Sequence, residues 1–322
     1  MRFSFQHKMF KKRIYLYSLF ISVSLSACIK VMPEPTDPTL GESSFENALD
    51  RGGLDNPRIM EASGIAASRK NPGYFWVTND SDVQGPMLYL IDSLGKGKKE
   101  YLLSGAIHRD WEDLAIVSET DGSATVFVAD FGDNFQDNPN YAIYWFKDLA
   151  ITSNPYTVLT DVNKLTFHLP DGFHDMETLL IDQKSKDIFV ISKRENSKRL
   201  YKIPAAKVLN GSTVTAEYIQ DLTFSTPFSS DAKIQQAYYL TGGSVSPDNT
   251  EILIRNYIGI YYWKRKTGES IPEALLRAAK AVPYQLEPQG EGVTFAHDGS
   301  GYYTLSESPD LTPAHLYYYK KK

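Results

Sequence analysis

The chain has 322 residues, with 34 lysine and arginine residues against 39 aspartate and glutamate residues and a formal net charge of −5 at pH 7. Five of the basic residues and none of the acidic ones lie among the first 27, so the rest of the chain has 29 basic and 39 acidic residues, a net charge of −10. An acidic chain without a basic stripe argues against a nucleic-acid partner, whose phosphates require clustered lysine and arginine. With one cysteine, an intramolecular disulfide is excluded.

The N-terminal segment has the pattern of an export signal. Four basic residues between positions 8 and 13 precede an apolar stretch, 14–26, which is too short to span a bilayer as a helix. The stretch leads into Leu25-Ser26-Ala27-Cys28. This resembles a bacterial lipoprotein signal, in which cleavage leaves Cys28 to carry a lipid; the alternative is an ordinary secretory signal with a chance cysteine. We predict a signal peptide over 1–27, a proline-rich, lipid-anchored spacer over 28–44 and a folded domain over 45–322, held at the outer side of a membrane in the cell envelope.

An internal repeat organises the rest of the chain. The phrase D-x-E, with an apolar residue two positions later, occurs at 110–114 and 175–179, and looser copies lie at 61–65, 241–245 and 289–293. The apolar residues that align the copies are Ile65, Leu114, Leu179, Val245 and Val293, with spacings of 49, 65, 66 and 48 residues.

Each copy precedes further runs rich in β-branched and aromatic residues between turn signals. The second runs are 74–78, 126–130, 188–192, 251–255 and 302–306. The third runs are 88–92, 143–146, 200–203, 260–263 and 316–319. Candidates for a fourth run are 100–103, 164–169, 213–222 and 281–286.

This pattern predicts an all-β protein, a β-propeller of five blades. A sixth blade would require one of the two long spacings to contain a degenerate unit. The last unit has no fourth run, so we expect 45–54 to supply it and close the ring. A capping box at Ser270 and Glu273, with Pro272 between them, predicts one helix leading through 274–281.

The first strand of a blade lines the central channel, so the repeated phrase places polar side chains at one end of that channel. One row holds Glu61, Asp110, Asp175, Thr241 and Gln289, and the next holds Ser63, Glu112, Glu177, Gly243 and Glu291. Converging carboxylates repel one another unless a cation offsets them, and calcium takes six to eight oxygen ligands. We therefore name Glu112, Glu177 and Glu291 as candidate metal ligands. The candidate ligand-binding residues are Asp80, Asp110, Asp130, His174, Asp175, Lys193, Arg194, Arg255 and Glu307.

Structural roles are the alternative for several of these residues. A repeated carboxylate is also what a hydrogen-bonded latch between neighbouring blades would require, and a lone histidine such as His174 is more often structural. The segment 130–134 resembles a calcium loop only loosely, so an Asx-turn is the preferred interpretation. No zinc spacing, nucleophile elbow, phosphate loop or dinucleotide motif is present in the sequence.

The ordered set of phrases resembles a family of secreted bacterial β-propeller proteins, distantly similar to TolB-like and phytase-like propellers. The phrases lie at 63–68, 71–73, 79–81, 110–115, 130–134, 170–172, 174–180, 192–194, 241–248 and 289–293. The resemblance implies the fold and secretion, and it implies no particular activity. Phytase-like propellers hold calcium on axial carboxylates, but their phosphate-binding lysine and arginine cluster has no clear match in this chain.

Three functions follow as hypotheses. The first is a lipid-anchored propeller that binds a small-molecule, glycan or protein ligand at an acidic axial funnel, with calcium. The second is a metal-dependent hydrolase of a phosphate ester or glycan, in which Lys193, Arg194 or Arg255 stabilises developing negative charge. The third is a protein-interaction platform built on the tyrosine-rich third runs, which are more often blade packing.

Overall fold

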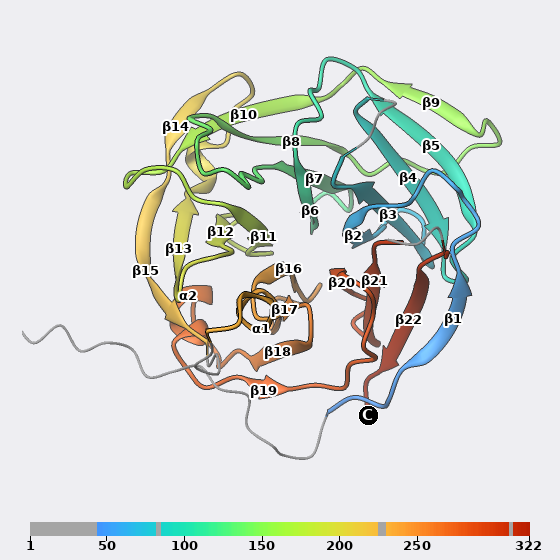
Figure 1. Cartoon of the computed structure of the whole chain (residues 1–322). Coiled ribbons are helices and arrows are strands. Elements are labelled where there is room, and N and C mark those ends of the chain that lie inside the picture. The colour runs from blue at the N-terminus through green and yellow to red at the C-terminus, as the bar shows by residue number, and fades with distance from the viewer. Residues whose placement is uncertain (1–43, 82–84, 225–229, 309–311) are drawn as a thin grey trace, which may run out of the picture. The chain divides into compact units, whose positions relative to one another are not determined.

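A computed structural model describes residues 44–81, 85–224, 230–308 and 312–322. Over these residues the chain forms five mainly antiparallel sheets arranged as the blades of a propeller (Figure 1), which confirms the predicted fold class. The predicted signal peptide, Cys28 and nearly all of the spacer lie outside the described residues, so these remain predictions.

The strands follow the predicted runs closely. Blade one consists of β2 (Ala62–Ala67), β3 (Tyr74–Asn79), β4 (Met87–Asp92) and β5 (Gly97–Leu103). Blade two consists of β6 (Trp111–Ser118), β7 (Ala124–Asp130), β8 (Tyr141–Lys147) and β10 (Asn163–His168). Blade three consists of β11 (Met176–Ile181), β12 (Ile188–Ser192), β13 (Ser197–Ile203) and β15 (Glu217–Thr223). Blade four consists of β16 (Leu240–Val245), β17 (Glu251–Asn256), β18 (Gly259–Lys264) and β19 (Lys280–Ala281). Blade five consists of β20 (Gly290–Phe295), β21 (Gly301–Ser306), β22 (His315–Lys320) and β1 (Leu49–Gly53).

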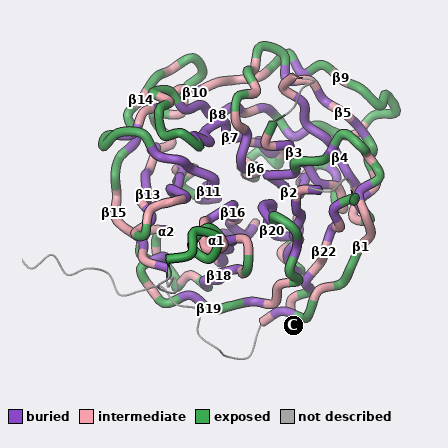
Figure 2. The backbone as a smooth tube through the Cα atoms, viewed as in Figure 1, coloured by how far each residue is buried: buried purple, intermediate pink, exposed green. Residues whose placement is uncertain are grey.

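The inner strands β2, β6, β11, β16 and β20 contact one another around the axis. Every residue of β2, β11 and β20 is buried, and Figure 2 shows that the connecting loops carry most of the exposed surface. Apolar side chains of neighbouring blades fill the space between the sheets, as Trp76 of blade one does with Phe146 of blade two. Most of the aromatic residues in the third strands are buried in these interblade cores, as Tyr141, Tyr144 and Trp263 are, so blade packing accounts for them.

The two ends of the described chain meet in blade five. Strand β1 pairs antiparallel with β22, with Leu49 opposite Tyr318, and Phe45 packs edge-on against Tyr262 and Tyr302. This confirms the prediction that 45–54 closes the ring.

The long second and third spacings hold extra outer strands rather than a sixth blade among the described residues. Strand β9 (Tyr156–Leu159) pairs parallel with β5, and β14 (Thr213–Thr215) pairs parallel with β10. The predicted strand 213–222 was therefore wrong as one unit: it divides at Ala216, whose N–H donates to His168 O at 2.9 Å. Its first part extends blade two and its second part completes blade three.

Two further predictions need correction. The fourth strand of blade four is the short β19 rather than 281–286, because Pro283 has no N–H for a ladder. Helix α2 (Ile271–Leu275) has the predicted capping box at Ser270, but it ends at Leu275 instead of 281. A second short helix, α1 (Ala232–Gln236), was not predicted.

All five inner strands share a β-bulge near their first residue, where the pairing with the second strand skips one position. The skipped residues are Ser63, Glu112, Glu177, Thr241 and Glu291. In blade four Gly243 opposes Ile254 as Leu179 opposes Val190 in blade three. Gly243, and not Val245, is therefore the residue of blade four that corresponds to Leu179, so the sequence alignment of this repeat was wrong by two residues. A shift of two residues leaves every side chain on the same face of the strand, so the apolar pattern does not reveal it.

Hydrogen bonds near the bulges fasten neighbouring blades. Ser63 Oγ donates to Trp111 O at 2.6 Å, and Thr241 Oγ1 donates to Gly290 O at 3.1 Å. The fully buried carboxylate of Asp113 accepts three backbone N–H groups, from Leu114 at 2.8 Å, Leu179 at 2.9 Å and Gly243 at 3.2 Å. Asp113 therefore links the inner strands of blades two, three and four.

Replacement of Asp113 should lower stability sharply. We expect Asp113→Ala to lower the free energy of unfolding by about 3 kcal/mol, because it leaves buried N–H groups of two other blades without an acceptor. Asp113→Asn keeps one carbonyl oxygen and should lose less. Urea-induced unfolding measures both, with the exposed Asp161→Ala as a control that changes the free energy by less than about 0.5 kcal/mol. A loss for Asp113→Ala no larger than that of the control would contradict the linking role.

Candidate functional site

The first residues of the inner strands and the last residues of the second strands lie at the same end of the channel, because each such pair is antiparallel. Acidic side chains from four blades gather there. We call them the axial acidic cluster: Asp80, Asp110, Glu112, Asp175, Glu177, Glu291 and Glu307. The structure thus brings together all three predicted metal ligands and four of the predicted ligand-binding residues.

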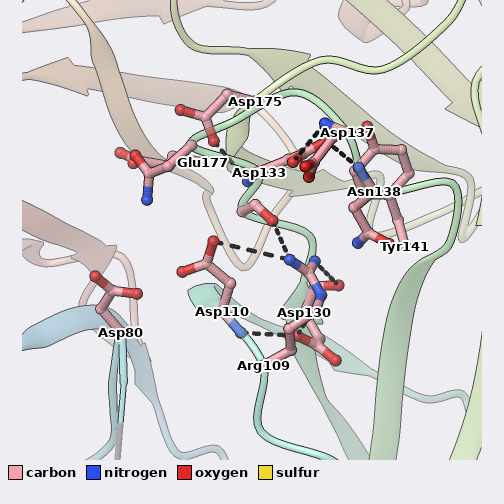
Figure 3. A network of polar contacts seen from close by, with 12 residues as sticks. Asp80, Arg109, Asp110, Asp130, Asp133, Asp137, Asn138, Tyr141, Asp175 and Glu177 are labelled. Atoms are coloured by element: carbon pink, nitrogen blue, oxygen red, sulfur yellow. Dashed lines mark hydrogen bonds and ion pairs between the residues drawn. The ribbon is translucent and has the colours of Figure 1, made fainter.

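Two overlapping triads have the geometry of a cation site. The first triad is Asp80, Asp110 and Glu112, and the second is Glu112, Asp175 and Glu177; in each, one oxygen of every carboxylate lies within 4.8 Å of the others. Figure 3 shows Asp80, Asp110, Asp175 and Glu177 gathered from blades one, two and three. Glu112 is common to both triads, which makes it the central carboxylate of the cluster.

Backbone contacts position the first triad. The carbonyl of Asp80 accepts the N–H of Trp111 at 3.0 Å and lies 2.9 Å from Nε2 of His108, whose ring stacks on Trp111. The N–H of Asp110 donates to Asp130 at 3.1 Å. The carboxylates of Glu112 and Asp110 lie against Gly132, where a Cβ would overlap them and displace both side chains.

The second triad has basic partners from its own blade. Lys193 forms an ion pair with Glu177, and Arg194 Nε lies 2.5 Å from Asp175 Oδ2. The other oxygen of Asp175 accepts the N–H of Asp133 at 2.8 Å. Glu177 Oε2 is buried and has no hydrogen-bond partner among the residues that the structure describes.

Glu112 is the least compensated member of the cluster. Only 3% of its surface is exposed, and no described residue forms a hydrogen bond or an ion pair with its carboxylate. The ion-pair partner of the first triad is Arg109, which lies 3.8 Å from Asp110 and 3.9 Å from Asp130 and whose side chain is 33% exposed. Lys193 also stabilises the charges of Asp80 and Glu112 without forming an ion pair with either.

The remaining cluster members come from blade five. Glu291 accepts a hydrogen bond from Tyr257 Oη at 3.1 Å, and Glu307 accepts one from Gln289 Nε2 at 2.5 Å. Both glutamates are stabilised electrostatically by Lys193 and destabilised by neighbouring carboxylates.

Burial and mutual repulsion raise the pKa values of the cluster. Burial, a hydrogen bond with Asp80 and the charge of Asp80 raise the pKa of Asp110 to about 8. Burial and the charge of Glu307 raise the pKa of Glu291 to about 8. Burial, followed by the charges of Asp80 and Asp110, raises the pKa of Glu112 well above its usual range. All three shifts show that negative charge at this point of the fold is undercompensated.

The bulged glutamates do not form the expected latch to the backbone of a neighbouring blade. Within the described ranges, no backbone N–H donates to Glu112, Glu177 or Glu291, and the hydroxyls of Ser63 and Thr241 bond the next blade's backbone instead. Glu291 has an interblade contact of another kind, the hydrogen bond from Tyr257 of blade four. The segment 130–134 does not form the expected Asx-turn, which would bond the N–H two residues on. Asp133 instead accepts N–H groups from Asp137 and Asn138, four and five residues later and both at 3.1 Å, and so holds the loop that follows.

Three of the other predicted residues lie in networks of their own. Asp130 pairs with Arg109 behind Asp110. His174 Nδ1 lies 2.6 Å from Glu195, and its ring stacks on Tyr201. Arg255 is fully buried and donates to Gly292 O at 2.7 Å and to Tyr284 Oη at 2.8 Å, so it fastens blade four to blade five.

The sequence interpretation missed several residues that shape the site. Asp113 could have been recognised as a charge directly before the apolar run 114–117, which only a buried acceptor role explains. Tyr257 and Arg109 stand next to predicted strand ends, but nothing in the sequence indicates that they face the channel.

No protein-family model matches the chain, and no curated protein is similar enough in sequence to count as a relative. Among solved structures, "Kuenenia stuttgartiensis Hydrazine Synthase" is similar at a TM-score of 0.42 and 11% identity, over 80% of this chain and 95% of that chain. A likeness at this level carries no information about activity, and the propeller assignment depends on the strand pairing described above. None of the helices in the described part of the chain is long and apolar enough to cross a membrane.

The raised pKa values predict a pH dependence of stability. Asp110 and Glu291 titrate near pH 8 in the fold and near pH 4 when unfolded, so the folded state binds more protons between these values. Stability should therefore fall as the pH rises from about 5 to about 8. We expect the Tm of the metal-free protein in EDTA to fall over this range, and the fall to be smaller in Asp110→Asn/Glu291→Gln. Asp161→Asn is the control, and an equal fall in all three proteins would rule out the cluster as its source.

Proposed function

We propose that the axial acidic cluster binds a divalent cation, calcium in the first instance, and that the protein uses this cation to hold a ligand at the mouth of the channel. The observation that carries the proposal is Glu112: a buried carboxylate shared by two triads, with no hydrogen bond or ion pair from any described residue. An ionised carboxylate in this position requires a cation, since an unpaired buried charge is strongly unfavourable.

The donor atoms favour a hard cation. The cluster offers carboxylate oxygens alone, and no histidine belongs to either triad. Calcium accepts such oxygen ligands at variable number and geometry, whereas zinc prefers nitrogen and sulfur ligands. Three carboxylates do not fill six to eight positions, so water or an external ligand would complete the coordination. Asp80 and Asp110 are partly exposed, which gives such a ligand access.

The proposed function places the protein outside the cytoplasm. The segment 1–27 and Cys28 support an exported protein that is anchored to the membrane by a lipid. The extracytoplasmic compartments of bacteria are where a calcium site of modest affinity would be filled. The ligand would then be a small molecule, a glycan or a protein that the chain meets at the cell envelope.

Calcium titration with and without Glu112 tests the proposal. We expect isothermal titration calorimetry of the full chain in detergent to show calcium binding, and Glu112→Gln to weaken it by at least about 100-fold, because the shared ligand loses its charge. The same titration on Glu217→Gln, an exposed glutamate with 46% of its side-chain surface accessible, should match the wild type.

Two outcomes would contradict the proposal. One is the absence of calcium binding in the wild type, with elemental analysis showing no other divalent cation in the purified protein. The other is binding that survives in Glu112→Gln with unchanged affinity, which would place the cation elsewhere.

A hydrolase is the second candidate, and Glu291 is the observation that favours it. Glu291 lies outside both triads, has a pKa raised to about 8 and accepts a hydrogen bond from Tyr257. A carboxyl group with a near-neutral pKa beside a metal-bound water could act as general acid or base on a phosphate ester or glycan. Lys193 and Arg194 would stabilise negative charge in the transition state.

The hydrolase is tested by turnover. A screen of phosphate esters and glycans with the calcium-loaded protein should find a substrate whose kcat falls by about 100-fold or more in Glu291→Gln, in line with general acid–base catalysis, while calcium affinity stays within a few-fold. Absence of turnover across the screen, with calcium bound, would leave the binding function standing and reject the enzyme.

A further inference from the structure

The two triads of the axial acidic cluster differ in how their charge is compensated. In the second triad, two of the three carboxylates already have a basic partner: Lys193 on Glu177 and Arg194 on Asp175. In the first triad, only Asp110 forms an ion pair with a described residue, Arg109 at 3.8 Å, and Lys193 stabilises Asp80 and Glu112 without forming an ion pair with either.

The basic residues of the second triad are built into the fold. Lys193 is 6% exposed, its N–H donates to Asp175 O at 2.8 Å, and its ammonium lies 5.9 Å from the ring centre of Tyr257. Arg194 lies over the ring of Tyr239 at 5.4 Å and donates to Asn134. Both side chains are therefore held where a cation bound to the second triad would lie.

The carboxylates without an ion pair lie in the first triad. Asp80 Oδ1 is buried without a hydrogen bond from a described residue, whereas Asp175 and Glu177, which also have an unbonded buried oxygen, are each ion-paired. Glu112 is nine-tenths or more buried, forms no hydrogen bond or ion pair with a described residue, and is stabilised by Lys193 only through space. It faces Asp80 and Asp110, whose charges are the largest electrostatic causes of its raised pKa after burial. The place that lacks a cation is thus the first triad.

We infer that Lys193 and Arg194 take the place of a second metal ion, so that the cluster binds a single divalent cation, in the first triad. This inference rests on the proposed function and adds the position and number of the cations. A metal in the second triad would have to displace Lys193 from Glu177. The displaced ammonium would remain buried without its carboxylate, which is costly. The five carboxylates of the two triads are then balanced by one divalent cation, one lysine and one arginine, with one negative charge left over.

The inference predicts that removal of the two basic residues creates a second metal site. Calcium titration and elemental analysis of the full chain in detergent should give about one calcium per chain for the wild type and about two for Lys193→Met/Arg194→Gln, since three free carboxylates suffice to recruit calcium. Asp110→Asn should abolish binding in the wild-type background and leave about one calcium in the double variant.

The outcomes separate this inference from the proposed function. No calcium in the wild type overturns the proposed function. Two calcium ions in the wild type, or one in both proteins, overturn the inference and leave the proposed function intact. Near-ultraviolet circular dichroism establishes that the double variant is folded. If the double variant is not folded, the single variant Lys193→Met provides the test, because it frees Glu177. We expect this variant to have a second, weaker calcium site. A folded Lys193→Met protein without that second site overturns the inference.

Discussion

The bulge at the start of every inner strand is the constraint on which the site depends. A bulge inserts one unpaired residue into a strand and redirects its side chain. Because the repeat places it at the same position in each blade, five such residues converge at one end of the channel. Three are glutamates, and flanking aspartates add to them. The acidic cluster is therefore a consequence of propeller symmetry combined with the residue chosen at one position of each repeat.

The chain compensates this charge unevenly. Asp113, one residue after the bulge, receives three backbone N–H groups and acts as a structural acceptor. Glu177 and Asp175 are balanced by Lys193 and Arg194, which continue directly from the second strand of the same blade. Glu291 accepts a hydrogen bond from a tyrosine hydroxyl, Glu112 forms no hydrogen bond with a described residue, and Lys193 stabilises both without an ion pair. Fully compensated carboxylates therefore lie beside carboxylates that are left for a ligand, within one small region.

Much of this could be read from the sequence, and the exceptions have physical causes. The five repeats, the closing strand and the carboxylate convergence follow from alternation, turn residues and the D-x-E phrase. The anchor in blade four was placed at Val245 instead of Gly243 because a slip of two residues preserves the buried face. The strand 213–222 looked continuous because nothing local shows that its halves pair with different blades. The roles of Arg255 and His174 depend on contacts with Gly292, Tyr284 and Glu195 that tertiary packing creates.

The choice of side chain at the bulges argues for a ligand over a purely structural role. A hydroxyl can donate, so Ser63 and Thr241 each fasten the next blade through a carbonyl oxygen. An ionised glutamate is an acceptor only and cannot make that contact. Each glutamate at this position therefore gives up the hydrogen bond to the next blade's carbonyl, although Glu291 accepts one from Tyr257 of blade four. Each also adds a buried charge, and both changes are unfavourable for folding. Stability alone would favour serine or threonine in all five blades. Glutamate in blades two, three and five is explained if the energy lost in folding is recovered when a cation binds.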